Sequence, residues 1–189
     1  MLLTRGSLIV CGVLAACGDP AAPACEVPGD VELGLVAATA AGELVDLAAG
    51  DDVPLTFAPQ GGHILLVAPR IRDLAACTVD VTAALRDKTN DRVVGLEQRP
   101  IELTPRADGW AVPADPTSLA GLANLAVCPT SAASTPINDH VFQLEVSIDA
   151  GDGVARPMVA LDVMPRCAVD DTYCACDCDP TGAACAAAR

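Results

Sequence analysis

Aromatic side chains are scarce in this chain of 189 residues, where they make up 2% of the composition. The whole set is Phe57, Trp110, Phe142 and Tyr173. Surfaces that bind sugars or proteins use aromatic rings for rigid contact area, so this scarcity disfavours a carbohydrate-binding platform. We expect Trp110, which follows a glycine, to fill a core or strand-edge position.

Positive charge is also scarce, with 11 Lys and Arg against 25 Asp and Glu and a formal net charge of −14. Affinity for nucleic acid depends on Lys and Arg that neutralise phosphates, so nucleic acid is not an expected partner. Lys88 is the sole lysine and follows Asp87 rather than a glycine, which excludes a P-loop. The acidic surface is expected to keep the protein soluble.

Long hydrophobic runs and common catalytic motifs are missing as well. The best apolar run beyond the N-terminus, residues 119–127, contains Asn124 and is too short to span a bilayer. The chain has no Gly-x-Ser-x-Gly elbow, His-Glu-x-x-His helix or Gly-x-Gly-x-x-Gly turn. We therefore expect no enzyme and assign no catalytic residue.

The N-terminus has the pattern of a secretory signal. Residues 1–5 are short and positively charged, residues 8–14 are apolar, and small residues follow. The end of this segment, Leu14-Ala15-Ala16-Cys17, resembles the lipobox of bacterial lipoproteins. The alternative is a plain secretory signal that is cut nearby and leaves Cys17 as an ordinary half-cystine.

The resemblance implies that residues 1–16 are a lipoprotein signal peptide and that Cys17 carries the lipid. Residues 17–30, which include three prolines, then form the lipid anchor and a short Pro-rich tether. The implied location is the bacterial cell envelope, at the outer membrane, on its periplasmic or surface face. The membrane is then a partner through the lipid anchor alone.

The remaining cysteines are even in number, if Cys11 in the signal and Cys17 are set aside. In an oxidising compartment, eight such cysteines predict four disulfides whose pairing the sequence leaves open. Five of them lie in the last 23 residues, so complete pairing requires at least one bridge between the tail and the body. The candidates are Cys25, Cys77, Cys128, Cys167, Cys174, Cys176, Cys178 and Cys185.

Apolar residues alternate with polar ones through most of residues 31–166. Residues 79–85 and 142–148 have the period of half-buried strands, and residues 141–164 predict a hairpin with its turn at 149–153. Residues 64–67 are continuously apolar, which suits a central strand covered on both faces. Weaker strand candidates are 31–36, 53–57, 92–103 and 109–112. Asp115-Pro116 is positioned to cap one short helix over 118–126.

About seven short strands predict an all-β domain over residues 31–166. We expect an antiparallel β-sandwich of the immunoglobulin-like type, with a small barrel as the alternative, followed by a disulfide-rich tail over 167–189. Pro59-Gln60-Gly61-Gly62-His63 before a strand, the late hairpin and Pro165-Arg166-Cys167 resemble uncharacterised myxobacterial-type secreted lipoproteins with an Ig-like domain. That resemblance implies a location rather than an activity.

The tail and the two histidines are the candidate chemical sites. Cys174, Cys176 and Cys178 are spaced so that their thiolates could bind Cu⁺ or Zn²⁺, although disulfides or free redox thiols are the alternatives. Four tail carboxylates could bind Ca²⁺, but their spacing matches no EF-hand loop. They are Asp170, Asp171, Asp177 and Asp179. His63 and His140 would form a shared site only if the fold brought them together.

These patterns predict a membrane-anchored lipoprotein of the cell envelope that acts as a non-catalytic surface or periplasmic interaction module, with no cofactor. Its partner is expected to be a protein of unknown identity. The alternative is a metal-handling lipoprotein that uses the Cys- and Asp-rich tail for Cu, Zn or Ca.

Overall fold

The computed structural model describes residues 23–149, apart from 29 and 40, and residues 158–185, apart from 170 and 184. The predicted signal peptide, Cys17 and most of the expected turn at 149–153 lie outside the described residues. Their predictions therefore stay predictions.

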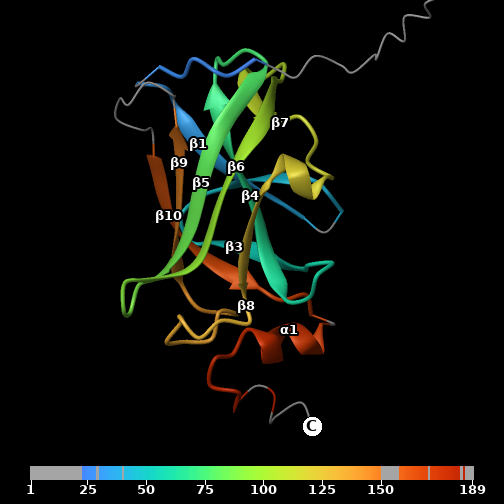
Figure 1. The fold of residues 1–189 in the computed structure, drawn as a ribbon, viewed down its shortest axis with the longest axis vertical. Helices are drawn as coiled ribbons and strands as arrows, with labels where there is room; N and C mark the ends of the chain where they lie inside the picture. The colour runs from blue at the N-terminus through green and yellow to red at the C-terminus, as the bar shows by residue number, and fades with distance from the viewer. Residues whose placement is uncertain are drawn as a thin grey trace, which may run out of the picture.

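The described chain is built almost wholly of strands, which confirms the all-β prediction. The strands are β1 (Leu33–Ala38), β2 (Leu44–Leu47), β3 (Asp51–Phe57), β4 (His63–Arg72), β5 (Cys77–Asp87), β6 (Arg92–Pro105), β7 (Trp110–Pro113), β8 (Ala123–Cys128), β9 (Phe142–Asp149) and β10 (Met158–Arg166). A 3-10 turn, η1 (Leu119–Gly121), precedes β8, and a short helix, α1 (Thr172–Asp177), follows β10. Figure 1 shows how these elements follow one another in space.

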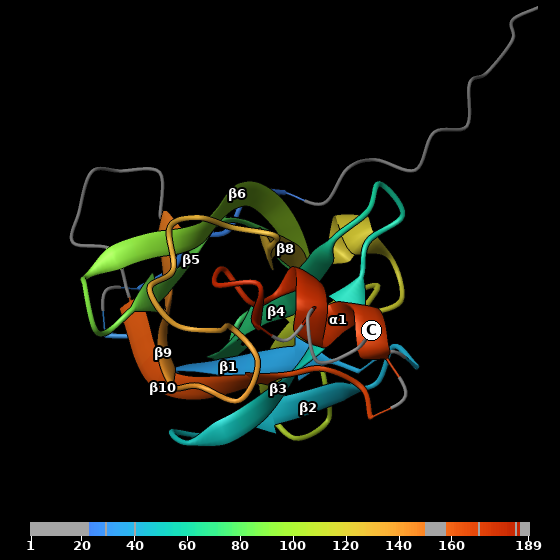
Figure 2. The same ribbon diagram turned by 90° about the horizontal axis from the view of Figure 1, so that it is seen from below.

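Seven strands close into a barrel. In the order β4, β3, β10, β9, β5, β6 and β7, each strand pairs with the next, and β7 pairs back with β4. The β10–β3 pair is parallel, and the other neighbours in the ring are antiparallel. β1 and β8 also pair with β4, because that strand is long enough to have different neighbours along its length. Figure 2 views the ring along its axis.

The closed ring differs from the immunoglobulin-like sandwich that the sequence analysis expected, and agrees with the alternative of a small barrel. Alternation of apolar and polar residues is the same in both architectures, because each strand buries one face in either case. The difference lies in two long-range pairings, β4 with β7 and β3 with β10. Neither pairing joins strands that follow one another along the chain.

The core fills the barrel with the side chains that the periodicity assigned to it. On β9, the alternate residues Phe142, Leu144, Val146 and Ile148 are fully buried. The continuous apolar run at the start of β4 is buried on both faces, as predicted for a central strand. β9 and β10 pair antiparallel, which confirms the two strands of the predicted hairpin.

The prediction of a helix over 118–126 was wrong. Ser118 does cap a helical turn by accepting a hydrogen bond from the backbone N–H of Ala120, but that turn is η1, and β8 begins at Ala123. Leu125 and Val127 point into the core at a period of two, so pairing with β4 decides the structure. Strand β2 and helix α1 were not predicted.

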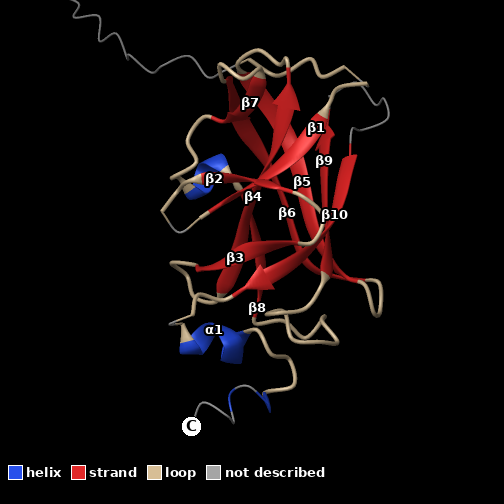
Figure 3. Cartoon of the chain, turned by 180° about the vertical axis from the view of Figure 1, so that it is seen from behind, coloured by secondary structure: helices blue, strands red, loops and turns tan. Residues whose placement is uncertain are grey.

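The two ends of the barrel hold different parts of the chain. The Cys25–Cys77 disulfide and a bridge between Ala24 and Thr78 attach the segment before β1 to the start of β5. Helix α1 lies at the other end, below the strands in Figure 3. Part of the expected tether, from residue 24 onward, is thus bound to the barrel. Within the described residues, no helix is long and apolar enough to cross a membrane.

Candidate functional site

Four disulfides join all eight cysteines that the sequence analysis singled out, which confirms the disulfide-rich character of the protein. The pairs are Cys25–Cys77, Cys128–Cys178, Cys167–Cys174 and Cys176–Cys185. Cys128–Cys178 joins the tail to the end of β8, so the required bridge between tail and body exists. Cys167–Cys174 joins the end of β10 to α1.

Helix α1 is short, and its position depends on these links. Asp171 is its N-cap and accepts a hydrogen bond from the backbone N–H of Cys174, at 2.9 Å. Beyond the helix, the backbone N–H of Ile137 donates to the carbonyl of Cys178, at 2.7 Å. A helix of six residues has little stability of its own, so the disulfides and these contacts hold it over the end of the barrel.

His63 begins β4 at the end of the barrel that α1 covers, and it is fully buried. It pairs with Cys128 across β8, and the register shifts immediately after it. Gly62 allows this close approach: its φ is +78°, and a Cβ there would lie 2.3 Å from the carbonyl oxygen of Cys128. The imidazole also packs edge-on against the ring of Phe57, with 5.6 Å between ring centroids.

Two carboxylates flank the imidazole of His63. Nε2 lies 3.0 Å from Oδ2 of Asp171, and this hydrogen bond holds the pKa of Asp171 below its ordinary value. Partial burial opposes the shift and the N–H of Cys174 adds to it. An ionised carboxylate only accepts, so Nε2 carries a proton and donates. Nδ1 lies 3.6 Å from Oδ2 of Asp177, within ion-pair range but without a hydrogen-bond partner.

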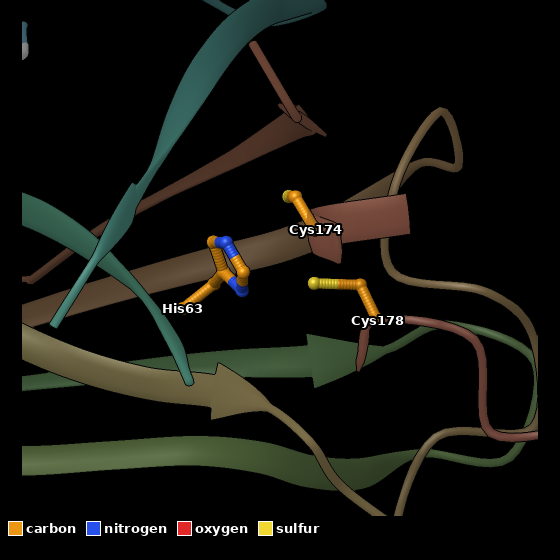
Figure 4. Close-up of side chains that lie close together, drawn as sticks. All are labelled: His63, Cys174 and Cys178. Atoms are coloured by element: carbon orange, nitrogen blue, oxygen red, sulfur yellow. The ribbon is translucent and has the colours of Figure 1, made fainter. Parts of the chain in front are cut away.

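The imidazole lies beside two sulfur atoms, as Figure 4 shows. One ring nitrogen of His63 and the Sγ atoms of Cys174 and Cys178 all lie within 4.8 Å of one another, and all three residues are buried. Residues four apart on a helix share a face, which brings these two cysteines together. Both sulfurs belong to disulfides, so neither is a thiolate in this structure.

The tail cysteines therefore do not act as the set that their spacing suggested. Cys176 lies between Cys174 and Cys178 in the sequence but pairs with Cys185, away from the imidazole. Residues two apart on a helix point in different directions, which explains the separation. The histidine was not part of the predicted metal-binding set, and the structure adds it.

The other predicted candidates lie apart from this cluster. His140 is exposed, and its Nδ1 is 3.0 Å from the carbonyl oxygen of Asn138, so the structure does not join it to His63. Asp179 turns back on its own loop and accepts hydrogen bonds from the backbone and hydroxyl of Thr181. Asp170 lies outside the described residues.

A second concave surface lies beside β7. Its cavity of about 390 Å³ is lined by residues that include Arg70, Arg106 and Trp110. The guanidinium of Arg70 covers the ring of Trp110 at 4.2 Å and pairs with Asp46, so both the ring and the charge already have partners within the chain. Trp110 is half-buried at the start of β7, where it pairs with Arg72 of β4 and its carbonyl accepts a hydrogen bond from the backbone N–H of Arg106, so it lies neither in the core nor at a free strand edge.

No protein family, curated protein or solved structure matches this chain. The proposals below therefore rest on the residues and their geometry.

Proposed function

We propose that this protein is a lipid-anchored module of the bacterial cell envelope that binds a protein partner outside the cytoplasm and catalyses no reaction. The observation that carries the proposal is the character of the α1 end, which is locked by disulfides and yet exposes large apolar side chains. Phe57 is 60% exposed, Tyr173 78% and Val169 fully exposed. All three lie at the end of the barrel that α1 covers, and large apolar side chains that meet water at one end of a domain are candidates for a binding surface.

The disulfides support a location outside the cytoplasm. Complete pairing of eight cysteines requires an oxidising compartment, in agreement with the secretory signal at residues 1–16. The pairing also fits a binding module, since cross-links stabilise the folded domain that presents the surface. The polar partners of His63 are carboxylates and its neighbouring sulfurs are in disulfides, so within the described residues no hydroxyl or free thiol is hydrogen-bonded to its imidazole.

The lipid would hold the barrel close to the membrane. Cys25, fixed to the barrel by its disulfide, follows Cys17 by only eight residues, which reach at most about 28 Å when fully extended. The segment attaches at the end opposite α1 (Figure 1). This arrangement would direct Phe57, Val169 and Tyr173 away from the lipid surface and toward a partner.

The lipid anchor is tested by expressing the whole precursor in a bacterium with lipoprotein processing. We expect acyl chains on the mature chain by intact mass, recovery in the membrane fraction, and loss of both in Cys17→Ala. Cys11→Ala is the matched control, because it removes a cysteine from the signal without touching the acceptor, and it should behave like the wild type. Equal membrane recovery of Cys17→Ala would refute the anchor.

The binding surface is tested separately, with a photo-crosslinking amino acid in place of Tyr173 or Val169. A discrete crosslinked protein is expected from both positions in intact cells, and none from Glu26, which lies at the other end of the barrel. Crosslinks that are equally strong from Glu26 would refute the assignment of the surface to the α1 end.

A further inference from the structure

The α1 end contains a set of atoms that could bind a metal ion, but its sulfur atoms are in disulfides and are not thiolates. The structure places His63 Nδ1 or Nε2 and two buried sulfurs within 4.8 Å of one another. In a tetrahedral zinc site the same atoms would be ~3.6–3.8 Å apart, given the usual Zn–N and Zn–S bond lengths. The donors therefore need to move together by only about 1 Å, and their disulfide partners oppose that movement.

A second observation is the environment of the remaining ring nitrogen of His63. Its Nδ1 is buried and lacks a hydrogen-bond partner, although the carboxylate of Asp177 lies 3.6 Å away. Nε2 is held by Asp171, so Nδ1 is the ring nitrogen left to meet a ligand, and Oδ2 of Asp177 beside it is a further ligand atom. A carboxylate that holds the far nitrogen of a histidine is the usual support of a metal-bound imidazole.

We propose that reduction of the Cys167–Cys174 and Cys128–Cys178 disulfides opens a zinc site formed by His63, Cys174 and Cys178. Asp171 would orient the imidazole, and Asp177, whose Oδ2 lies 3.6 Å from Nδ1, would supply the fourth ligand. Nitrogen and sulfur donors in this ratio suit Zn²⁺ rather than Ca²⁺. The site goes beyond the proposed binding function and does not depend on the lipid anchor.

The chemistry balances with a dithiol as the reductant. Each disulfide accepts two electrons and two protons from one dithiol, which becomes a disulfide itself, so two dithiols yield four protein thiols. Zn²⁺ then binds the thiolates of Cys174 and Cys178 and releases their two protons to water. Cys128 and Cys167 remain as thiols.

A surface cavity gives the reductant a route to the cluster. A cavity of about 620 Å³ is lined by Cys167 and Asp171 among other residues. A second cavity, of about 440 Å³, is lined by Cys176 and Asp177 among other residues. The Cys167–Cys174 disulfide can thus be attacked first at Cys167, and its opening frees α1 to expose Cys178.

The main test compares zinc binding by four forms of the protein without the signal peptide and with Cys17→Ala. The oxidised chain should bind no zinc. Cys128→Ser/Cys167→Ser, which leaves Cys174 and Cys178 as thiols and retains the other two disulfides, should bind one zinc ion when it is handled without oxygen and without a reductant, so that the thiols stay reduced and the disulfides intact. Adding His63→Gln should weaken zinc binding by about tenfold or more, whereas adding His140→Gln should change it less than twofold.

Cobalt(II) supplies an independent readout, since tetrahedral thiolate coordination gives intense visible bands. These bands should appear in the double variant and lose intensity with His63→Gln. Zinc binding of equal strength by the oxidised wild type, or with His63→Gln, would overturn the proposal. So would the absence of zinc binding by a double variant that keeps the circular dichroism of the barrel.

A second measurement covers the case in which the double variant does not fold. Wild-type protein is reduced with a dithiol, given zinc, and alkylated for a short time before mass mapping. Zinc should protect Cys174 and Cys178 and leave Cys128 and Cys167 reactive. Equal protection of all four would indicate a four-cysteine site, and protection of none would indicate no site; either result overturns the proposal.

Discussion

Asp87 is the buried carboxylate whose removal tests the packing of the long loop between β8 and β9. It is 1% exposed and accepts four hydrogen bonds. Oδ1 accepts from the backbone N–H and hydroxyl of Thr89, at 2.8 and 2.6 Å. Oδ2 accepts from the backbone N–H and hydroxyl of Ser134, both at 2.7 Å. One side chain thus joins the β5–β6 hairpin to the loop that reaches β9.

The substitution Asp87→Asn keeps the shape but replaces one acceptor oxygen by an NH₂ group. The two hydroxyls can rotate, but one backbone N–H then faces a donor and loses its partner. A buried unsatisfied donor costs about 1–3 kcal/mol, and the remaining bonds lose the strength that the negative charge gave them. We expect the free energy of unfolding to fall by about 2–3 kcal/mol, which lowers Tm by roughly 4–10 °C in a domain of this size.

The stabilisation that the Asp87 carboxylate gives should decrease as the pH falls. Burial raises the pKa of Asp87, but the hydrogen bonds from Ser134 and Thr89 outweigh it, so the folded pKa lies well below the ordinary 3.8. A group with a lowered folded pKa stabilises the protein fully above its unfolded pKa, and this stabilisation is lost as pH falls toward the folded pKa. The Tm difference between wild type and Asp87→Asn should therefore be constant from pH 7 to 5 and narrow between pH 4 and 2.5.

The assay is calorimetry of the oxidised barrel with Cys17→Ala, with Asp51→Asn as the control for the loss of one negative charge at an exposed position. Asp51→Asn should leave Tm within about 1 °C of the wild type. A Tm loss below 1 °C in Asp87→Asn at pH 7, or a difference that stays the same at pH 3, would refute the reasoning.

Three further comparisons of variants test the α1 end and the cross-links. Gly62→Ala should lower the free energy of unfolding by at least ~2 kcal/mol, because its Cβ would meet the carbonyl of Cys128. Gly61→Ala, which has open space around it, should lower it by about 1 kcal/mol. Equal losses of Tm in the two variants would contradict this prediction. Asp171→Ala should speed hydrogen exchange in Cys174–Cys178 by about tenfold while β9 stays protected, and Asp171→Asn, which still caps the helix, should speed it less. Removing the Cys25–Cys77 disulfide, which closes a loop of 52 residues, should lower the free energy of unfolding by about 4 kcal/mol. Removing Cys176–Cys185, which closes nine residues, should lower it by about 2.5 kcal/mol. The reverse order in denaturant titrations would be inconsistent with stabilisation through the chain entropy of the unfolded state.

The sequence predicts strands well because burial on one face leaves a period of two in each of them. The alternation through residues 79–85 and 142–148 follows from that rule alone and needs no knowledge of neighbours. Closure of the barrel cannot be predicted from this alternation, because β4 and β7 are separated by two other strands along the chain. The helix predicted over 118–126 fails for the same reason: its alternation is weak, and only the edge of β4 makes it a strand.

The candidate site could be predicted in part. Gly61-Gly62-His63 directly before a continuous apolar run indicates a histidine drawn into the core, and Asp171 three residues before Cys174 has the spacing of a helix cap. A helix there would have placed Cys174 and Cys178 on one face and Cys176 on a different one. The meeting of α1 with His63 could not be predicted, because it depends on disulfides that join positions 50 and seven residues apart.

The same two disulfides connect the proposed functions of the α1 end. While they are intact, α1 is fixed, Tyr173 and Val169 are presented in one arrangement, and the ligand atoms around His63 are unavailable. Reduction would free α1, and zinc would draw Cys174 and Cys178 toward the imidazole, so the apolar side chains next to them would move as well. A partner that recognises the oxidised surface should therefore bind the reduced, zinc-loaded form more weakly. Crosslinking from Tyr173, repeated with dithiol alone and with dithiol plus zinc, would separate the loss of the disulfides from the effect of the metal.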